Sequence, residues 1–141
     1  MTPMNDFERI YNDWHEFAKN RDTARLIGLY DDNAVFESPL VPLIMQRQSG
    51  ILRGKADILA FLEEGTRRRP NELVRWYRNG THFTTGDTLV WEYPRETPGG
   101  DQVDILELMQ IAGGKIVHHR IYWGWFGTQM LIRSALNRAA E

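Results

Sequence analysis

The sequence predicts an α+β domain, a cone-shaped α+β barrel in which N-terminal helices pack in a curved, mostly antiparallel sheet. Helical periodicity is confined mainly to the first half of the chain, and strand-like patterns dominate from about Leu73 onward. The length of 141 residues fits one domain over 1–141. A curved sheet with helices in its hollow leaves a cavity of the kind that small-molecule sites favour.

Three helices are expected before the long strands. Thr2 and Pro3 predict the start of the first one, because a capping hydroxyl and a first-turn proline favour helix initiation. Its apolar face recurs at three- and four-residue spacing through Phe7, Ile10, Tyr11, Trp14, Phe17 and Ala18. Asp22 predicts the N-cap of a second helix that ends at Leu29 or Tyr30. The third helix is expected over 55–68.

A short strand and an unusual loop lie between the second and third helices. The strand is expected over 34–39, where Pro39 stops it. Residues 39–54, PLVPLIMQRQSGILRG, are expected to form a loop of high apolar content. Its start, PLVPLIM, is either a lid over a pocket or a dimer contact, and the sequence does not decide between them.

Antiparallel strands fill the second half of the chain. Residues 73–93 are expected to form two strands that turn near Gly86, and 94–102 form a proline- and glycine-rich reversal. A hairpin follows, with strands over 103–111 and 116–125 and a turn at AGGK, 112–115. Gly127 is then expected to precede a last amphipathic helix over 128–140.

The composition limits the function classes. The hydrophobic fraction of 42%, the charged fraction of 26% and the net charge of −2 are typical of a soluble protein and give no electrostatic case for nucleic acid or an anionic membrane as partner. Cysteine is absent, which excludes disulfides, thiolate nucleophiles and cysteine-ligated metals and fits a cytoplasmic location. No segment reads as a signal peptide or a membrane span. No metal and no cofactor are expected, and Arg67–Arg69 are read as a solvated helix end.

Strand alternation divides the last hairpin between two faces. One face should carry His119, Ile121, Trp123 and Trp125, and the other His118, Arg120 and Tyr122. Because adjacent histidines then point apart, they make a poor metal pair. On the preceding strand, Val103, Ile105, Glu107 and Met109 share a face, and Leu106 and Leu108 lie opposite. Apolar residues on both faces predict that both are covered, the outer one by a second copy or by the C-terminal helix.

Glu107 is the leading candidate for chemistry. It sits between apolar neighbours in ILELMQI, where a carboxylate is costly to bury unless it is neutral or paired. One interpretation is a carboxyl of raised pKa that acts as an acid or base on a ligand carbonyl. The other is a structural pair, for example with His119 on the next strand. A Glu–His pair would also serve as an acid–base couple.

Three segments, RDTARLIGLYDDNAVFESPL (21–40), LRGKADILAFL (52–62) and VDILELMQIAGGKIVHHRIYW (103–123), resemble a known family by their order. The chain is similar to the SnoaL-like, ketosteroid isomerase-like branch of the nuclear transport factor 2-like superfamily. The resemblance covers nearly the whole chain. It implies a conical barrel with a deep pocket for a small hydrophobic molecule, and a homodimer formed through the outer, convex sheet face.

The resemblance also assigns roles by position. Trp14 stands where isomerases have the tyrosine that donates to the oxyanion, and Tyr30 matches a supporting tyrosine. Ser38 replaces the proton-shuttling aspartate, whereas Glu107 keeps the second carboxyl. SnoaL-type cyclases carry an aspartate where this chain has Ile121. One carboxyl is therefore retained, and two acidic positions are lost.

The candidate site combines a polar and an apolar set. The catalytic candidates are Glu107, His119, Trp14, Tyr30 and His82. Trp14 is either a hydrogen-bond donor or core, and His82 is either a ligand contact or a structural group. Only one of Glu37 and Ser38 can face inward. The ligand-binding candidates, mostly aromatic and suited to a flat cyclic molecule, are Phe17, Phe36, Ser38, Trp76, Trp91, Met109, Ile121, Trp123 and Trp125.

Three functions remain open from the sequence. The first is an enzyme that performs cofactor-free acid–base chemistry, such as isomerisation, cyclisation or dehydration, on a hydrophobic cyclic carbonyl compound. The second is a non-catalytic carrier or sensor of a small hydrophobic ligand. The third is a protein-interaction module, for which the polar outer face and the apolar loop are the only indications.

Overall fold

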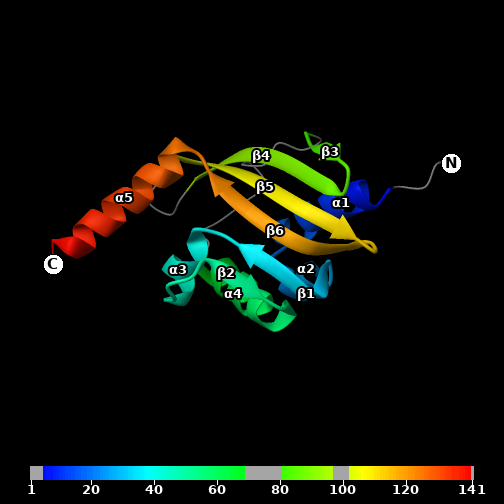
Figure 1. The fold of residues 1–141 in the computed structure, drawn as a ribbon, viewed down its shortest axis with the longest axis horizontal. Helices are drawn as coiled ribbons and strands as arrows, with labels where there is room; N and C mark the ends of the chain where they lie inside the picture. Colours follow the sequence, from blue (N-terminus) through cyan, green and yellow to red (C-terminus); the bar gives the residue numbers. More distant parts are fainter. Residues whose placement is uncertain (1–4, 69–80, 97–101, 141) are drawn as a thin grey trace.

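The computed structural model describes residues 5–68, 81–96 and 102–140 (Figure 1). The helices in this part of the chain are α1 (Asp6–Lys19), α2 (Thr23–Ile27), α3 (Leu40–Met45), α4 (Lys55–Arg68) and α5 (Trp125–Ala139). The strands are β1 (Tyr30–Glu37), β2 (Ile51–Arg53), β3 (Phe83–Thr85), β4 (Thr88–Glu96), β5 (Gln102–Ala112) and β6 (Lys115–Trp123).

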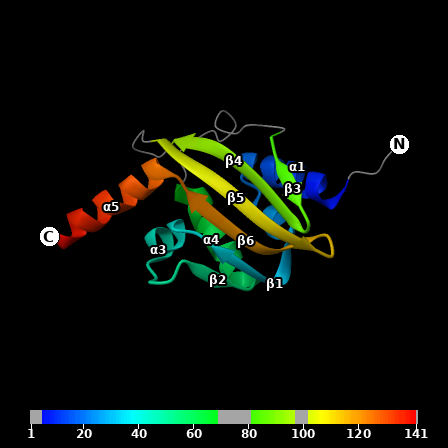
Figure 2. The ribbon, with the colours of Figure 1, turned by 45° about the horizontal axis from the view of Figure 1, so that its top comes forward.

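The strands form one curved, open sheet in the order β2-β1-β6-β5-β4-β3. Neighbouring strands are antiparallel except β1 and β6, which are parallel. Figures 1 and 2 show α1 and α4 behind the sheet, on the same face, which we call the inner face. The opposite, outer face is the convex one. The predicted α+β class, with helices packed on a curved and mostly antiparallel sheet, is confirmed.

The first two helices begin at side-chain caps. Asn5 caps α1 by accepting a 2.8 Å hydrogen bond from the Glu8 amide, so α1 begins later than expected. Residues 2 and 3, where the start was predicted, lie outside the described residues. Asp22 caps α2 as predicted, since its carboxylate accepts from the Arg25 amide at 3.1 Å. This helix ends at Ile27, because the chain becomes extended at Tyr30, the first residue of β1.

The loop predicted over 39–54 is wrong for two parts of that segment. Residues 40–45 form α3, in which Val41 and Ile44 are buried at the three-residue spacing of one helical face. Residues 51–53 form β2, which pairs with the end of β1. Its middle residue, Leu52, is fully buried opposite Phe36. The high apolar content of this segment thus came from a short helix and a short strand that pack in the core.

The last helix also begins earlier than predicted. It starts at Trp125, so Gly127 lies inside α5 and does not precede it. A Cβ at position 127 would lie 2.6 Å from Trp123 Cε3 and 2.9 Å from Val103 Cγ1, which is too close for any side chain. The glycine therefore lets the first turn of α5 pack closely on the ends of β5 and β6. From there the helix extends away from the sheet (Figures 1 and 2).

The β5–β6 hairpin fixes which side chains face inward. Gly113 and Gly114 have φ angles of +58° and +75°, which a two-residue hairpin turn of type I′ requires. The turn predicted at 112–115 is confirmed. Burial then alternates along β5, with the inner face made of Val103, Ile105, Glu107, Met109 and Ile111. None of the helices in the described part is both long enough and apolar enough to cross a bilayer.

Candidate functional site

Glu107 and His119 meet at the centre of the inner face. In the β5–β6 register, Glu107 lies opposite Ile121, and His119 lies opposite Met109. The two polar residues are therefore diagonal neighbours on one face, within reach of each other. The distance from His119 Nε2 to Glu107 Oε2 is 2.5 Å, and each residue is 1% exposed. The pair suggested by the sequence is present and is fully buried.

Two tyrosines extend this pair at both ends. The Tyr30 hydroxyl lies 2.8 Å from His119 Nδ1, and the Tyr93 hydroxyl donates to Glu107 Oε1 at 2.9 Å. We call Tyr30, His119, Glu107 and Tyr93 the polar chain. Its members come from β1, β6, β5 and β4, four consecutive strands of the sheet. Each strand places one polar group on the inner face, and together the four groups satisfy one another's hydrogen bonds.

The polar chain can take up a proton without moving its heavy atoms. One proton lies between His119 and Glu107, and one between Tyr30 and His119. If His119 Nε2 donates to the Glu107 carboxylate, a neutral imidazole accepts from Tyr30 through Nδ1. If the chain takes up one further proton and the Glu107 carboxyl carries it, Nε2 accepts, Nδ1 donates to Tyr30, and the Tyr30 hydroxyl is released to donate elsewhere. The chain therefore has two states that present different groups at its ends.

Burial changes the pKa of Tyr30, the member of the polar chain on β1. It raises the pKa of the Tyr30 hydroxyl well above the ordinary value, because the charged phenolate would be poorly solvated, although the Trp14 side chain opposes part of this rise. The phenol thus stays protonated at neutral pH. The exchangeable proton of the chain consequently belongs to His119 and Glu107.

The structure brings four of the five catalytic candidates together. Trp14 on α1 packs edge-on against His119, with 6.3 Å between ring centroids, and its side chain hydrogen-bonds with Tyr30. The fifth, His82, does not join the polar chain. It is half-buried and packs on the Tyr11 ring, with 4.5 Å between centroids.

Tyr93 and His15 were missed by sequence reasoning. Tyr93 lies two residues after Trp91 on β4, so the alternation that placed Trp91 inside also places Tyr93 inside. His15 follows Trp14 on α1, and its Nδ1 donates to the Tyr11 carbonyl oxygen at 2.7 Å. Burial lowers the pKa of His15, opposed by that hydrogen bond and by the Glu107 carboxylate. A neutral histidine therefore lies near the polar chain, and no sequence signal distinguished it.

Several of the ligand-binding candidates surround the polar chain. Phe36 packs edge-on against His119 at 4.9 Å between centroids, and Trp91 lies opposite Glu107 in the β4–β5 register. Met109 is fully buried opposite His119. The remaining inner positions that pack at the edge of this core are Phe17, Ile121 and Trp123.

Two of the ligand-binding candidates are not placed beside the polar chain. Trp125 was expected on the inner face of the last strand, but this is wrong. The strand ends at Trp123, and Trp125 begins α5 with 63% of its surface exposed. Trp76 lies outside the described residues.

The choice between Glu37 and Ser38 is settled by their positions. Ser38 is buried, and its Oγ accepts from the Leu40 amide at 3.1 Å. Glu37 lies on the outer face and hydrogen-bonds to His118. The two neighbouring histidines thus bind carboxylates on opposite faces of the sheet, so they do not converge on one metal. No group of three or more metal-ligating side chains occurs in residues 5–68, 81–96 and 102–140.

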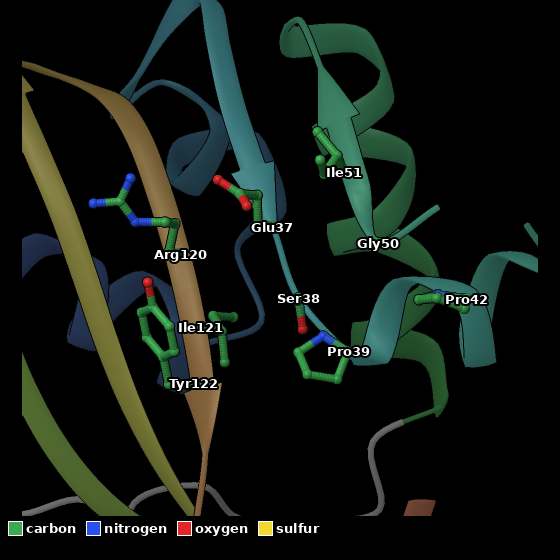
Figure 3. A pocket seen from close by; sticks show the side chains of 9 residues that line it. All are labelled: Glu37, Ser38, Pro39, Pro42, Gly50, Ile51, Arg120, Ile121 and Tyr122. Carbon is green, nitrogen blue, oxygen red and sulfur yellow. The ribbon is translucent and has the colours of Figure 1, made fainter. Parts of the chain in front are cut away.

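A groove of about 350 Å³ opens where β1 leaves β6 (Figure 3). Its lining includes Ser38, Pro39 and Pro42 on one side and Arg120 and Ile121 on the other. In Figure 3, Ile121 points toward Ser38, whereas Arg120 points away from it over the outer face. Neither Glu107 nor His119 lines this groove.

The chain matches the family model of the SnoaL-like domain over residues 11–119. No curated protein sequence matches it. Among solved structures, it is similar to a SnoaL-like protein of unknown function from Burkholderia thailandensis, with 18% identity and a TM-score of 0.65, covering 88% of this chain and 100% of that one.

Two further solved structures carry activity names. A candidate isomerase from Bacillus subtilis is 21% identical, with a TM-score of 0.64, and the match covers 86% of this chain and 90% of that one. A candidate ketosteroid isomerase from Kribbella flavida is 12% identical, with a TM-score of 0.63 and coverage of 85% and 78%. At these identities the likeness establishes a shared fold.

Proposed function

The chain belongs to the SnoaL-like domain family, and from this membership and the buried polar chain we propose that it performs cofactor-free acid–base chemistry on a small hydrophobic cyclic carbonyl compound. The reaction class is isomerisation, cyclisation or dehydration. The observation that carries the proposal is the Glu107–His119 pair, held between Tyr30 and Tyr93 on the inner face.

The pair has the parts that carbon acid chemistry requires. Glu107 accepts a proton from the carbon next to the ligand carbonyl, and the C–H electron pair forms the enolate double bond while charge develops on the carbonyl oxygen. Each carboxylate oxygen has two lone pairs, so the bonds from Tyr93 and His119 leave further acceptor capacity. His119 shares the acquired proton, and its return to the same carbon or another completes exchange or isomerisation.

The surroundings favour a flat, hydrophobic substrate. Trp14 packs on both Trp91 and His119, with 5.4 and 6.3 Å between ring centroids, and Phe36 packs on His119 at 4.9 Å. Aromatic walls offer apolar area and stacking to a cyclic molecule. Isomerase names among proteins of the same fold are consistent with this substrate class.

Proton exchange in heavy water tests the proposal. Wild-type protein is incubated with 2-tetralone and a panel of cyclic ketones, enones and polyketide-like aromatics, and deuterium uptake next to the carbonyl is followed by NMR. We expect catalysed exchange that falls at least 100-fold in Glu107→Gln, the usual scale for loss of a general base. His118→Gln, which removes the neighbouring histidine on the outer face, should retain the wild-type rate. Equal exchange in wild type and Glu107→Gln would refute the role of the carboxyl.

A non-catalytic carrier or sensor is the second candidate, and two observations favour it. Ser38 stands at the position of a proton-shuttling carboxylate and is already bonded to the Leu40 amide. Both oxygens of Glu107 are engaged within the protein. Binding of panel compounds, seen as quenching of tryptophan fluorescence, without any exchange would support this alternative.

A homodimer through the outer sheet face is part of the proposal. Leu106 and Leu108 are only half-buried there, and Tyr122 is exposed beside them. The alternative cover, α5, packs through Gly127 on Val103 and Trp123, which are inner-face residues. Sedimentation equilibrium should therefore give a dimer for the wild type and a monomer for Leu108→Glu, and a wild-type monomer would refute it. We also expect the protein to act in the cytoplasm.

A further inference from the structure

Trp91 carries a buried hydrogen-bond donor that no described residue satisfies. The residue is 1% exposed, and its indole Nε1 has no hydrogen-bond partner within residues 5–68, 81–96 and 102–140. Indole N–H is only a donor, so the missing partner is an acceptor. A buried polar group without a partner costs about 1–3 kcal/mol, and such exceptions in native proteins call for a ligand or water.

The position of Trp91 relates this donor to the candidate base. Trp91 lies directly opposite Glu107 in the β4–β5 register, and both side chains are on the inner face. Its ring also packs against Tyr11, Trp14 and His15, with centroid distances of 5.2, 5.4 and 5.2 Å. The indole is therefore held in place by α1 next to the carboxylate.

A second buried nitrogen belongs to the same ring cluster. His82 Nδ1 is also buried without a hydrogen-bond partner in the described part of the chain. The His82 ring contacts Tyr11, the ring that Trp91 contacts as well. Two unsatisfied nitrogens thus flank one tyrosine on the α1 side of the polar chain.

The electrostatics select a neutral acceptor. Glu107 lies opposite Trp91, and with Glu107 ionised, as the proposed reaction requires, a ligand carboxylate there would meet like-charge repulsion. His15, the histidine against the indole, is held neutral because burial lowers its pKa, so it supplies no compensating positive charge. A ketone or enone carbonyl oxygen satisfies the donor without that repulsion.

We propose that Trp91 Nε1 donates a hydrogen bond to the carbonyl oxygen of the ligand, with His82 in the same ring cluster as an auxiliary contact. This rests on the proposed function and assigns its oxyanion donor. When Glu107 removes the proton next to the carbonyl, the negative charge that develops on the oxygen faces the Trp91 N–H. Trp14, which stands at the donor position by resemblance, is already engaged within the protein: its ring packs on His119, and its side chain hydrogen-bonds with Tyr30.

Two probes of nearly equal shape isolate the carbonyl contact. 2-Acetylnaphthalene has the acceptor oxygen, and 2-ethylnaphthalene lacks it. Affinities are measured by fluorescence quenching for wild type, for Trp91→Phe, which keeps a ring but removes the donor, and for Trp125→Phe as the exposed control. We expect Trp91→Phe to weaken 2-acetylnaphthalene about tenfold and to leave 2-ethylnaphthalene unchanged. Trp125→Phe should change neither affinity.

A measurement on the wild type keeps the test valid if Trp91→Phe does not fold. In protein labelled with ¹⁵N-tryptophan, 2-acetylnaphthalene should shift the Trp91 indole N–H signal, whereas 2-ethylnaphthalene should shift it much less. The Trp91 signal is assigned as the one left after Phe replacement of each other tryptophan in turn.

The outcomes separate this inference from the proposed function. Equal affinity for both probes in every variant, or an unshifted Trp91 signal, overturns the assignment of Trp91 even if Glu107-dependent exchange is observed. Failure of both probes to bind overturns it together with the hydrophobic pocket. The expected probe preference without any exchange keeps the Trp91 contact and refutes the catalytic proposal alone.

Discussion

Replacing Tyr93 by phenylalanine removes one hydroxyl from the polar chain and leaves the ring in place. The Tyr93 hydroxyl donates at 2.9 Å to a carboxylate that is 1% exposed, and Tyr93 itself is 1% exposed. A buried hydrogen bond to a charged group contributes about 1.5–3 kcal/mol. Since the ring volume is preserved, we expect Tyr93→Phe to lower the free energy of unfolding by about that amount, a large share of the roughly 5–15 kcal/mol typical of a domain.

Urea denaturation followed by tryptophan fluorescence measures this loss. The control is Thr84→Val on β3, which also removes a hydroxyl and where an exposed position predicts a change within about 0.5 kcal/mol. Equal m-values for wild type and variants would show that the compared states expose the same surface. A loss for Tyr93→Phe no larger than for Thr84→Val would refute the claim that this hydroxyl stabilises a buried carboxylate.

A double-mutant cycle with Glu107→Gln then reports the charge of the carboxyl. In the Glu107→Gln background the amide oxygen still accepts from Tyr93, but the bond is neutral and contributes about 0.5–1.5 kcal/mol. The cost of Tyr93→Phe should therefore fall by about 1 kcal/mol if Glu107 is ionised in the folded protein. An unchanged cost would indicate a neutral Glu107.

Two further predictions concern packing and pH. Gly127→Ala should lower the free energy of unfolding by about 1–3 kcal/mol, because its Cβ would overlap Trp123 and Val103. Gly65→Ala in α4 should instead raise the free energy of unfolding by up to about 1 kcal/mol. Urea denaturation of both variants measures these changes, and a Gly127→Ala protein as stable as the wild type would contradict the packing. Burial lowers the pKa of His15 below 6.5, so the unfolded chain binds the proton more readily, and stability present above pH 6.5 declines as the pH falls through that value. His15→Gln should flatten this decline in unfolding experiments between pH 7.5 and 5.5, and an unchanged slope would refute the assignment.

The elements that sequence reasoning predicted correctly depend on local physics. The Asp22 cap, the glycine pair at 113–114 and the alternation along 103–123 each reflect a few neighbouring residues. The errors arose where tertiary packing overrode local signals. Residues 40–45 form a helix that buries Val41 and Ile44. Gly127 lies inside α5 at a position where close packing on Trp123 and Val103 leaves no room for a Cβ.

In the candidate site, too, features set by neighbouring residues were predicted, and features set by tertiary packing were not. Alternation and hairpin pairing were sufficient to place Glu107 beside His119 on the inner face, because both residues lie on adjacent strands. Tyr93 could have been found by the same alternation, since it follows Trp91 by two residues. The buried nitrogens of His82 and Trp91 could not, because their surroundings depend on which rings of α1 pack against them.

The rate of deuterium uptake next to the carbonyl of bound 2-tetralone decides whether Glu107 acts as a base. It should be compared between wild type and Glu107→Gln at equal ligand occupancy, with the uncatalysed rate subtracted. We expect a catalysed rate in the wild type that falls at least 100-fold in the variant. Bound ligand with no catalysed exchange in the wild type would contradict the acid–base function and leave the polar chain as a structural feature of a binding protein.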